Sequence, residues 1–132
     1  MSRTLVSSGS YLEPIMGFSR AVRVGNHVSV AGTAPIAEGG GTHGVGDVAA
    51  QTRRCFEISL KALAEAGAGP EHVTRCRLML TDISRWREAA EVHGEIFSAI
   101  RPVLTVVEVS AFVEPDWLVE TEIDAIITET PE

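Results

Sequence analysis

The chain has 132 residues, 45% of them hydrophobic and 22% charged, a composition typical of one folded domain spanning residues 1–132 rather than of a disordered segment. A net charge of −7 with a single lysine, Lys61, argues against a phosphate-binding surface, so we expect no nucleic-acid partner. No apolar run approaches the roughly 20 residues that cross a bilayer, and residues 1–7 lack the apolar core of a signal peptide. We therefore expect a cytoplasmic protein without a membrane partner.

A β-hairpin is the first element that the sequence predicts. Residues 20–24 and 27–31 are short segments rich in β-branched side chains, and Gly25-Asn26 between them suits the positive φ of a tight turn. Residues 38–46 follow with five glycines in nine positions, which is too unfavourable in backbone entropy for a helix or a strand. We therefore expect a mobile loop after the hairpin.

Two helices with a strand between them are predicted next. Asp47 can cap a helix whose apolar residues recur every three or four positions until Gly67 ends it. The segment 73–81 is partly β-branched and becomes apolar toward its end, which favours a strand. Ser84 then opens a second amphipathic helix that is expected to run to about Ala99.

Two final strands are predicted at 104–112 and 118–128, which completes the order ββαβαββ. A sheet of these strands with both helices on one face is an α+β fold. The other face of the sheet still needs a cover, and a chain of this length has no element left to supply one. We therefore expect the protein to self-associate.

Three acidic residues, Glu120, Glu122 and Asp124, alternate along the last strand and so point to the same face. Arg75 and Arg77 share a face in the same way and are candidate partners. Because strand carboxylates are usually satisfied by neighbours, we expect ion pairs at Glu122 and Asp124. For Glu120, an ion pair and a role in a functional site are both open.

The cysteines and tryptophans predict structure rather than chemistry. Cys55 and Cys76 are too few for a disulfide scaffold or a four-ligand zinc site, and neither shows an arrangement of basic neighbours that would clearly activate a thiol. Both are expected to be buried, and no metal site is expected. Trp86 and Trp117 are expected to anchor the core or an interface.

Six segments, taken in order, have a spacing that is specific although no single one is a sharp signature. They are Gly17-Phe-Ser-Arg20, Val28-Ser-Val-Ala-Gly-Thr-Ala-Pro35, Gln51 with the following helix, Thr81-Asp-Ile, Arg101-Pro-Val-Leu-Thr-Val-Val-Glu-Val109 and Leu118-Val-Glu-Thr-Glu122. In this order the chain resembles the YjgF/RidA family, also called the translation-inhibitor or liver perchloric-acid-soluble-protein family. The resemblance extends from Ser8 to Thr128.

This resemblance implies a chorismate-mutase-like fold and a homotrimer, in which sheet faces pack around a three-fold axis and small-molecule clefts form between neighbouring subunits. In active members of the family, an arginine in a Pro-x-Arg pattern binds a substrate carboxylate. A glutamate near the C-terminus positions the water that hydrolyses a reactive enamine or imine to a ketone and ammonia. No cofactor or metal is implied.

The arginine of this pattern is missing here. Leu104, in Pro102-Val-Leu, stands at the matching position, and leucine cannot form the bidentate pair that a guanidinium makes with a carboxylate. Arg101 lies three residues earlier and could partly replace the cation. We favour an exposed position for Arg101 at the rim of the cleft, because a shift of three residues in a loop rarely reproduces bidentate geometry.

The other site positions divide into lost and retained groups. Three polar side chains of the family are replaced by apolar ones, at Phe18, Ala31 and Ala90. The retained positions are Gly32, Thr33 and, as the residue that would position water, Glu120. His93 matches a helix aromatic of the family and is either a weak candidate proton carrier or, as we favour, a half-buried residue between helix and sheet.

Two functions follow as hypotheses. The leading one is a homotrimer whose interface clefts bind a small apolar or uncharged metabolite and hydrolyse an enamine or imine with Glu120, without standard 2-imino acid deaminase activity. The alternative is a non-enzymatic member that acts as a ligand sensor, scavenger or chaperone-like module. RNA cleavage fits poorly with the acidic charge.

Overall fold

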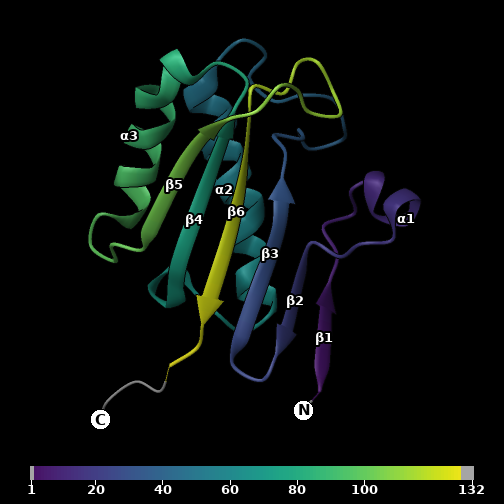
Figure 1. The fold of residues 1–132 in the computed structure, drawn as a ribbon. Coiled ribbons are helices and arrows are strands. Elements are labelled where there is room, and N and C mark those ends of the chain that lie inside the picture. Colours follow the sequence, from purple (N-terminus) through teal and green to yellow (C-terminus); the bar gives the residue numbers. More distant parts are fainter. Residues whose placement is uncertain (1, 129–132) are drawn as a thin grey trace.

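The computed structural model describes residues 2–128, and Figure 1 shows them as one layer of strands with two long helices on one face. Six strands form a single sheet in the order β1-β2-β3-β6-β4-β5, and neighbouring strands are antiparallel except for the parallel pair β4 and β5. The elements in chain order are β1 (Arg3–Val6), α1 (Leu12–Met16), β2 (Ala21–Val24), β3 (His27–Thr33), α2 (Val48–Glu65), β4 (Val73–Leu80), α3 (Trp86–Phe97), β5 (Val103–Glu108) and β6 (Val119–Ile126). The predicted α+β fold is confirmed.

The elements predicted from the sequence are present in the predicted order, and several of their boundaries have the expected cause. Gly25 has a positive φ of 59° in the turn between β2 and β3. The Asp47 carboxylate accepts a hydrogen bond of 2.9 Å from Ala50 N at the start of α2, and Gly67 has a φ of 90° just beyond its end. Turn and capping chemistry therefore delimits these elements as the sequence indicates.

Some elements were missed or differ in length. The sequence does not predict β1 and α1, which have four and five residues and too short a pattern to recognise. The strand β5 ends at Glu108 instead of residue 112, because its neighbour β4 ends at Leu80, the partner of Glu108. Ser84 lies in a short 3-10 turn capped by Asp82, and α3 begins two residues later, at Trp86.

The core lies between the sheet and the two long helices. Helix α2 buries Phe56 and Leu63, and Phe97 of α3 packs against Phe56 with ring centroids 5.4 Å apart. Trp117 is buried, as expected of an anchor. Trp86 instead is 45% exposed in this chain and lies beside the guanidinium of the next residue along α3.

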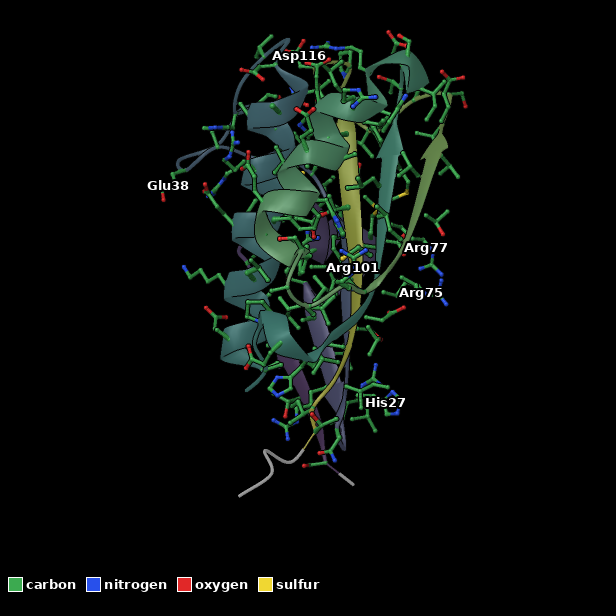
Figure 2. The ribbon with its side chains drawn as sticks, turned by 90° about the vertical axis from the view of Figure 1, so that its left-hand side faces the viewer. His27, Glu38, Arg75, Arg77, Arg101 and Asp116 are labelled. Atoms are coloured by element: carbon green, nitrogen blue, oxygen red, sulfur yellow. The ribbon has the colours of Figure 1, made fainter. Side chains whose placement is uncertain are left out.

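The start of β6 is tied to α2 by one buried amide. Gln51 Oε1 accepts a hydrogen bond of 2.8 Å from Leu118 N, and its Nε2 donates to Asp116 O at 2.9 Å and to Gly44 O at 3.2 Å. Asp116 lies in the loop at the top of the molecule in Figure 2. These hydrogen bonds hold the backbone at Leu118 against α2. Because Glu120 follows two residues later on β6, they also help to set the position of Glu120 relative to α2.

No helix among residues 2–128 covers the other face of the sheet. Figure 2 shows the helices on one side of the sheet, while the labelled side chains of His27, Arg75 and Arg77 project on the other. None of the helices within residues 2–128 combines the length and the apolar character needed to cross a membrane.

Candidate active site

A β-bulge in β3 brings the end of this strand against the first half of β6. Between Val30 and Thr33 the pairing shifts, so that Ala31 and Gly32 oppose a single residue of β6. A bulge of this kind re-aims neighbouring side chains. The carboxylate of Glu120 lies against the backbone at Gly32, where a Cβ atom would be only 3.2 Å from Glu120 Oε1. The absence of a side chain at Gly32 therefore makes room for this carboxylate.

Glu120 has an unusual environment for a strand carboxylate. It is half-buried, and its side chain makes no hydrogen bond or ion pair with any group in residues 2–128. Burial raises the pKa of Glu120, the guanidinium of Arg20 opposes this shift, and the neighbouring Glu122 adds to it. The carboxyl group can therefore exchange a proton closer to neutral pH than an exposed glutamate can.

The two other carboxylates of β6 are paired. Glu122 Oε2 lies 3.2 Å from Arg77 Nη1, and Asp124 Oδ2 lies 3.8 Å from Arg75 Nε. Both arginines come from β4, the neighbouring strand, and extend from the uncovered face in Figure 2. The ion pairs expected from the sequence at Glu122 and Asp124 are confirmed.

Arg20 belongs to this site although the sequence does not single it out. Only 3% of the residue is exposed, and its guanidinium donates three hydrogen bonds to the protein. Nη1 bonds Gly32 O at 2.7 Å and Thr33 Oγ1 at 3.2 Å, and Nε bonds Ser8 Oγ at 3.1 Å. Arg20 lies directly before β2, between Ser19 and Ala21, and this local sequence gives no signal that the guanidinium is buried.

Two further predicted residues lie around the guanidinium. The ring of Phe18 is 5.3 Å from the Arg20 Cζ atom, within the range of a cation–π contact. Thr33 is buried, and its Oγ1 donates a hydrogen bond of 2.8 Å to Ala31 O. The bulge therefore brings together five of the residues predicted from the sequence, namely Phe18, Ala31, Gly32, Thr33 and Glu120.

Leu104 is not part of this group within one chain. It lies on the edge strand β5, where its partner is Cys76, and Cys76 in turn pairs with Ile123 of β6. Leu104 thus shares the helix-side face of Ile123, whereas Glu120 belongs to the opposite face. In addition, β4 separates β5 from β6. A single chain cannot bring Leu104 and Glu120 into one pocket.

Ala90 and Arg101 lie on the same side of the molecule as Leu104. Ala90 is a half-buried residue of α3, and Arg101 follows α3 in the loop that leads to β5 (Figure 2). Arg101 is exposed and has a positive φ of 61°, and its backbone N–H donates to Phe97 O at 2.8 Å to end the helix. Its backbone conformation therefore serves the end of α3.

His93 lies in the core between the two long helices. Its ring centroid is 4.8 Å from that of Phe97 and 6.0 Å from that of Phe56. Burial lowers the pKa of His93, and its Nε2 has no hydrogen-bond partner within residues 2–128. His93 therefore packs against the aromatic rings of both long helices, and its lowered pKa favours the neutral side chain.

The two cysteines are buried, as predicted. Burial raises the pKa of Cys55 and, with a smaller contribution from Asp124, raises that of Cys76 to about 12. Neither thiol is therefore activated as a nucleophile. Three or more His, Cys, Asp or Glu side chains do not gather into a metal-binding arrangement anywhere between residues 2 and 128.

A cavity of about 660 Å³ adjoins the bulge. It lies between α2, the segment 7–11 and the loop 36–40, and both Arg20 and Thr33 contribute to its wall. Gly32 and Glu120 do not line it. The cavity is thus a neighbour of the Glu120 carboxylate and does not contain it.

These features define a class of protein, a mixed α+β domain whose central strands carry an unpaired carboxylate beside a bulge. Residues 8–127 match the family model described as Endoribonuclease L-PSP. The chain therefore belongs to the Endoribonuclease L-PSP family, which is the YjgF/RidA family that the sequence segments resemble.

Individual relatives agree with this assignment. The crystal structure of a Mycobacterium tuberculosis member of the YjgF/YER057c/UK114 family is 49% identical and has a TM-score of 0.86, covering 96% of this chain and 100% of that one. An uncharacterised protein of Streptomyces coelicolor is 38% identical over 91% of this chain and 89% of its own length. The 3-aminoacrylate deaminase RutC of Acinetobacter baylyi is 34% identical over 81% of this chain and 84% of its own.

Proposed function

We propose that this protein binds a small metabolite that lacks a carboxylate group and hydrolyses its enamine or imine to a carbonyl compound and ammonia. The observation that carries this proposal is the state of Glu120, a half-buried carboxylate without a partner in residues 2–128 whose pKa is raised by burial. Groups that give and take protons during a reaction work best when their pKa is close to the working pH. The deaminase activity named for the RutC relative supports the same class of chemistry.

The reaction requires Glu120 to act first as a base and then as an acid. The substrate reacts as an iminium ion, which forms when water protonates an imine at nitrogen or an enamine at its β-carbon. In the first step, the carboxylate of Glu120 accepts a proton from a second water while the oxygen of that water bonds to the iminium carbon, which gives a neutral amino alcohol. In the second step, the carboxylic acid returns the proton to nitrogen, the C–N bond breaks and ammonia leaves as the carbonyl forms, with the hydroxyl proton passing to the solvent. The sum consumes water and releases ammonia.

The ligand class follows from what surrounds the carboxylate. Leu104 stands where a cation would hold a substrate carboxylate, and 39% of it is exposed. We propose that the protein is a homotrimer in which Leu104, Ala90 and Arg101 of one subunit complete the cleft at Glu120 of the next. The support is that these residues and Glu120 lie on different sides of one chain, so a shared cleft requires a second copy. Such a cleft favours an uncharged or apolar ligand.

The test is ammonia release from a panel of uncharged enamines and imines generated in solution, with wild type compared with Glu120→Gln. We expect release by wild type and a large loss in the variant. The matched control is Glu122→Gln, two residues along the same strand, which should retain activity. Equal rates in wild type and Glu120→Gln would remove Glu120 from the mechanism.

A second candidate is a non-enzymatic ligand-binding protein. Its support is the replacement of four polar positions of the family by Phe18, Ala31, Ala90 and Leu104. Binding of an uncharged ligand that is the same in wild type and Glu120→Gln, without ammonia release from any substrate of the panel, would favour it. The cytoplasmic location stays a prediction, as does the lack of RNA cleavage.

A further inference from the structure

Arg20 contacts the same glycine as the proposed catalytic carboxylate. Its Nη1 donates a hydrogen bond of 2.7 Å to Gly32 O. On the Cα side of the same residue, the position of a Cβ atom is 3.2 Å from Glu120 Oε1. Gly32 is therefore held between a buried cation and the carboxylate.

The two charged groups act on each other without forming an ion pair. No nitrogen of Arg20 lies within 4.0 Å of a Glu120 oxygen, yet each group shifts the pKa of the other. A direct ion pair would occupy the lone pairs of the carboxylate. The observed separation leaves the oxygens of Glu120 free for water or ligand while the positive charge still acts on them.

The guanidinium is also held firmly in place. Its Nε donates to Ser8 Oγ at 3.1 Å, and Ser8 Oγ in turn donates to Glu13 Oε2 at 3.1 Å. Thr33 and the ring of Phe18 contact it from other sides. Burial lowers the pKa of Arg20, and the carboxylates of Glu13 and, to a smaller extent, Glu120 oppose this shift by stabilising the cation.

We propose that Arg20 is the positioning residue of the Glu120 site, which holds the bulge of β3 against the carboxylate and favours the ionised form of that carboxylate. This inference rests on the proposed function, in which Glu120 must be ionised to accept a proton from water. In this scheme Arg20 acts through its charge and through the bulge, to which two of its N–H groups donate, and a third donates to Ser8 Oγ.

Other groups that face Glu120 do not supply this charge. On β6, Glu122 opposes ionisation and is itself paired with Arg77 of β4. From α2, the thiol of Cys55 is close enough to interact, but burial keeps it neutral. The bulge of β3 contributes no ionisable side chain. Among residues 2–128, Arg20 is the one cation that lowers the pKa of Glu120.

The test is an NMR titration of the Glu120 side-chain carboxyl carbon, assigned by its loss in Glu120→Gln. In Arg20→Gln we expect the titration midpoint of Glu120 to move to higher pH, because the opposing positive charge is gone. Arg23→Gln is the matched control, since Arg23 also donates to backbone carbonyls, Gly25 O at 2.9 Å and Ala66 O at 2.8 Å, toward the other end of β2. It should leave the midpoint unchanged. A midpoint in Arg20→Gln equal to that of wild type would overturn the inference.

A second measurement keeps Arg20 in place, so it does not depend on whether an Arg20 variant folds. In wild type, the guanidinium 15N resonances of Arg20 should shift with the same midpoint as Glu120, and this shift should vanish in Glu120→Gln. Arg20 resonances that do not respond to the ionisation of Glu120 would also overturn the inference.

The inference and the proposed function can fail separately. If the midpoint moves in Arg20→Gln but ammonia release does not depend on Glu120, the positioning role stands and the proposed reaction falls. If ammonia release depends on Glu120 but its midpoint is unaffected by Arg20, the reaction stands and the positioning role falls. In Arg20→Lys, which keeps the charge, activity should recover relative to Arg20→Gln and the pH–rate profile should return toward that of wild type.

Discussion

Both halves of β6 carry carboxylates, but among the described residues those of the second half form ion pairs and the one in the first half does not. In the second half, Glu122 and Asp124 are paired with arginines of β4 on an open sheet face. In the first half, Glu120 points to the same face, has no partner in residues 2–128 and lies against a glycine at a bulge. The difference shows that alternation along a strand decides which way a carboxylate points, whereas the neighbouring strands decide whether it is satisfied.

The neighbours differ in a simple way. Next to the second half, β4 presents arginines at the positions that pair with Glu122 and Asp124. The partner of Glu120 in β4 is Met79, which offers no charge, and on its other side β3 has the bulge. The cation that acts on the pKa of Glu120 is Arg20, which bonds the bulge itself and forms no ion pair with the carboxylate. One carboxylate without a partner in residues 2–128 and two paired carboxylates thus come from one repeating pattern.

The largest expected effect is on the rate of ammonia release and comes from replacing Glu120. Glu120→Gln should lower the rate of ammonia release from an uncharged imine about 10²–10⁴-fold, the range typical of losing a general acid–base group. Glu122→Gln should change the rate much less, because its carboxylate is engaged by Arg77. Steady-state kinetics of the two variants measure the difference. Similar losses in both would mean that the pairing state does not distinguish these carboxylates.

A smaller effect is expected at the bulge. The Cβ added by Gly32→Ala would meet Glu120 Oε1 at 3.2 Å and displace the carboxylate by a few tenths of an ångström, so we expect about a tenfold loss of activity. Gly94→Ala is the matched control, because its Cβ would meet nothing within 4 Å. It should leave activity intact and stabilise α3 by about 0.5–1 kcal/mol. Full activity in Gly32→Ala would mean that the close contact with Glu120 has no role.

The free energy of unfolding should depend on pH through Glu120. Since the pKa of Glu120 is raised on folding, the folded chain retains this proton at pH values where the unfolded chain has lost it. The stabilising contribution of the protonated form is therefore present at low pH and lost as pH rises through the folded-state pKa. Glu120→Gln resembles the protonated form, so its stability relative to wild type should increase as pH rises above about 4 and should level off once pH has passed the folded-state pKa.

Urea unfolding of both proteins at several pH values measures this relative stability. We expect the stability of Glu120→Gln relative to wild type to grow with pH. A difference that is constant with pH, or that moves in the other direction, would show that folding does not raise the pKa of Glu120.

The smallest effect is expected at the paired end of β6. Arg77 and Glu122 have side chains that are 40% and 38% exposed, so breaking their ion pair in Arg77→Gln should cost less than about 1 kcal/mol. The cost should shrink further at high salt, because surface charges are screened. Thermal unfolding at low and high salt checks both points. A loss of several kcal/mol would identify this pair as part of the core.

Much of this picture follows from the sequence, and the rest depends on long-range contacts. The period-two pattern of Glu120 and its neighbours and the apolar spacing of α2 predict faces and elements correctly, because they depend on local geometry. Neither the bulge of β3 nor the burial of Arg20 follows from local pattern. Both depend on how β3 pairs with β6, some 90 residues later in the chain. The short elements β1 and α1 were missed because they owe their shape to their neighbours.

The most direct test of the account compares two substrates that differ in one group. Wild type should release ammonia from an uncharged imine more efficiently than from 2-iminobutyrate or 2-iminopropionate, since Leu104 offers no cation for their carboxylate. Leu104→Arg should improve kcat/KM for the 2-imino acids about 10- to 100-fold, as expected for a new charge-assisted hydrogen-bond pair. Wild-type turnover of these 2-imino acids that equals turnover of the uncharged imine would contradict the account.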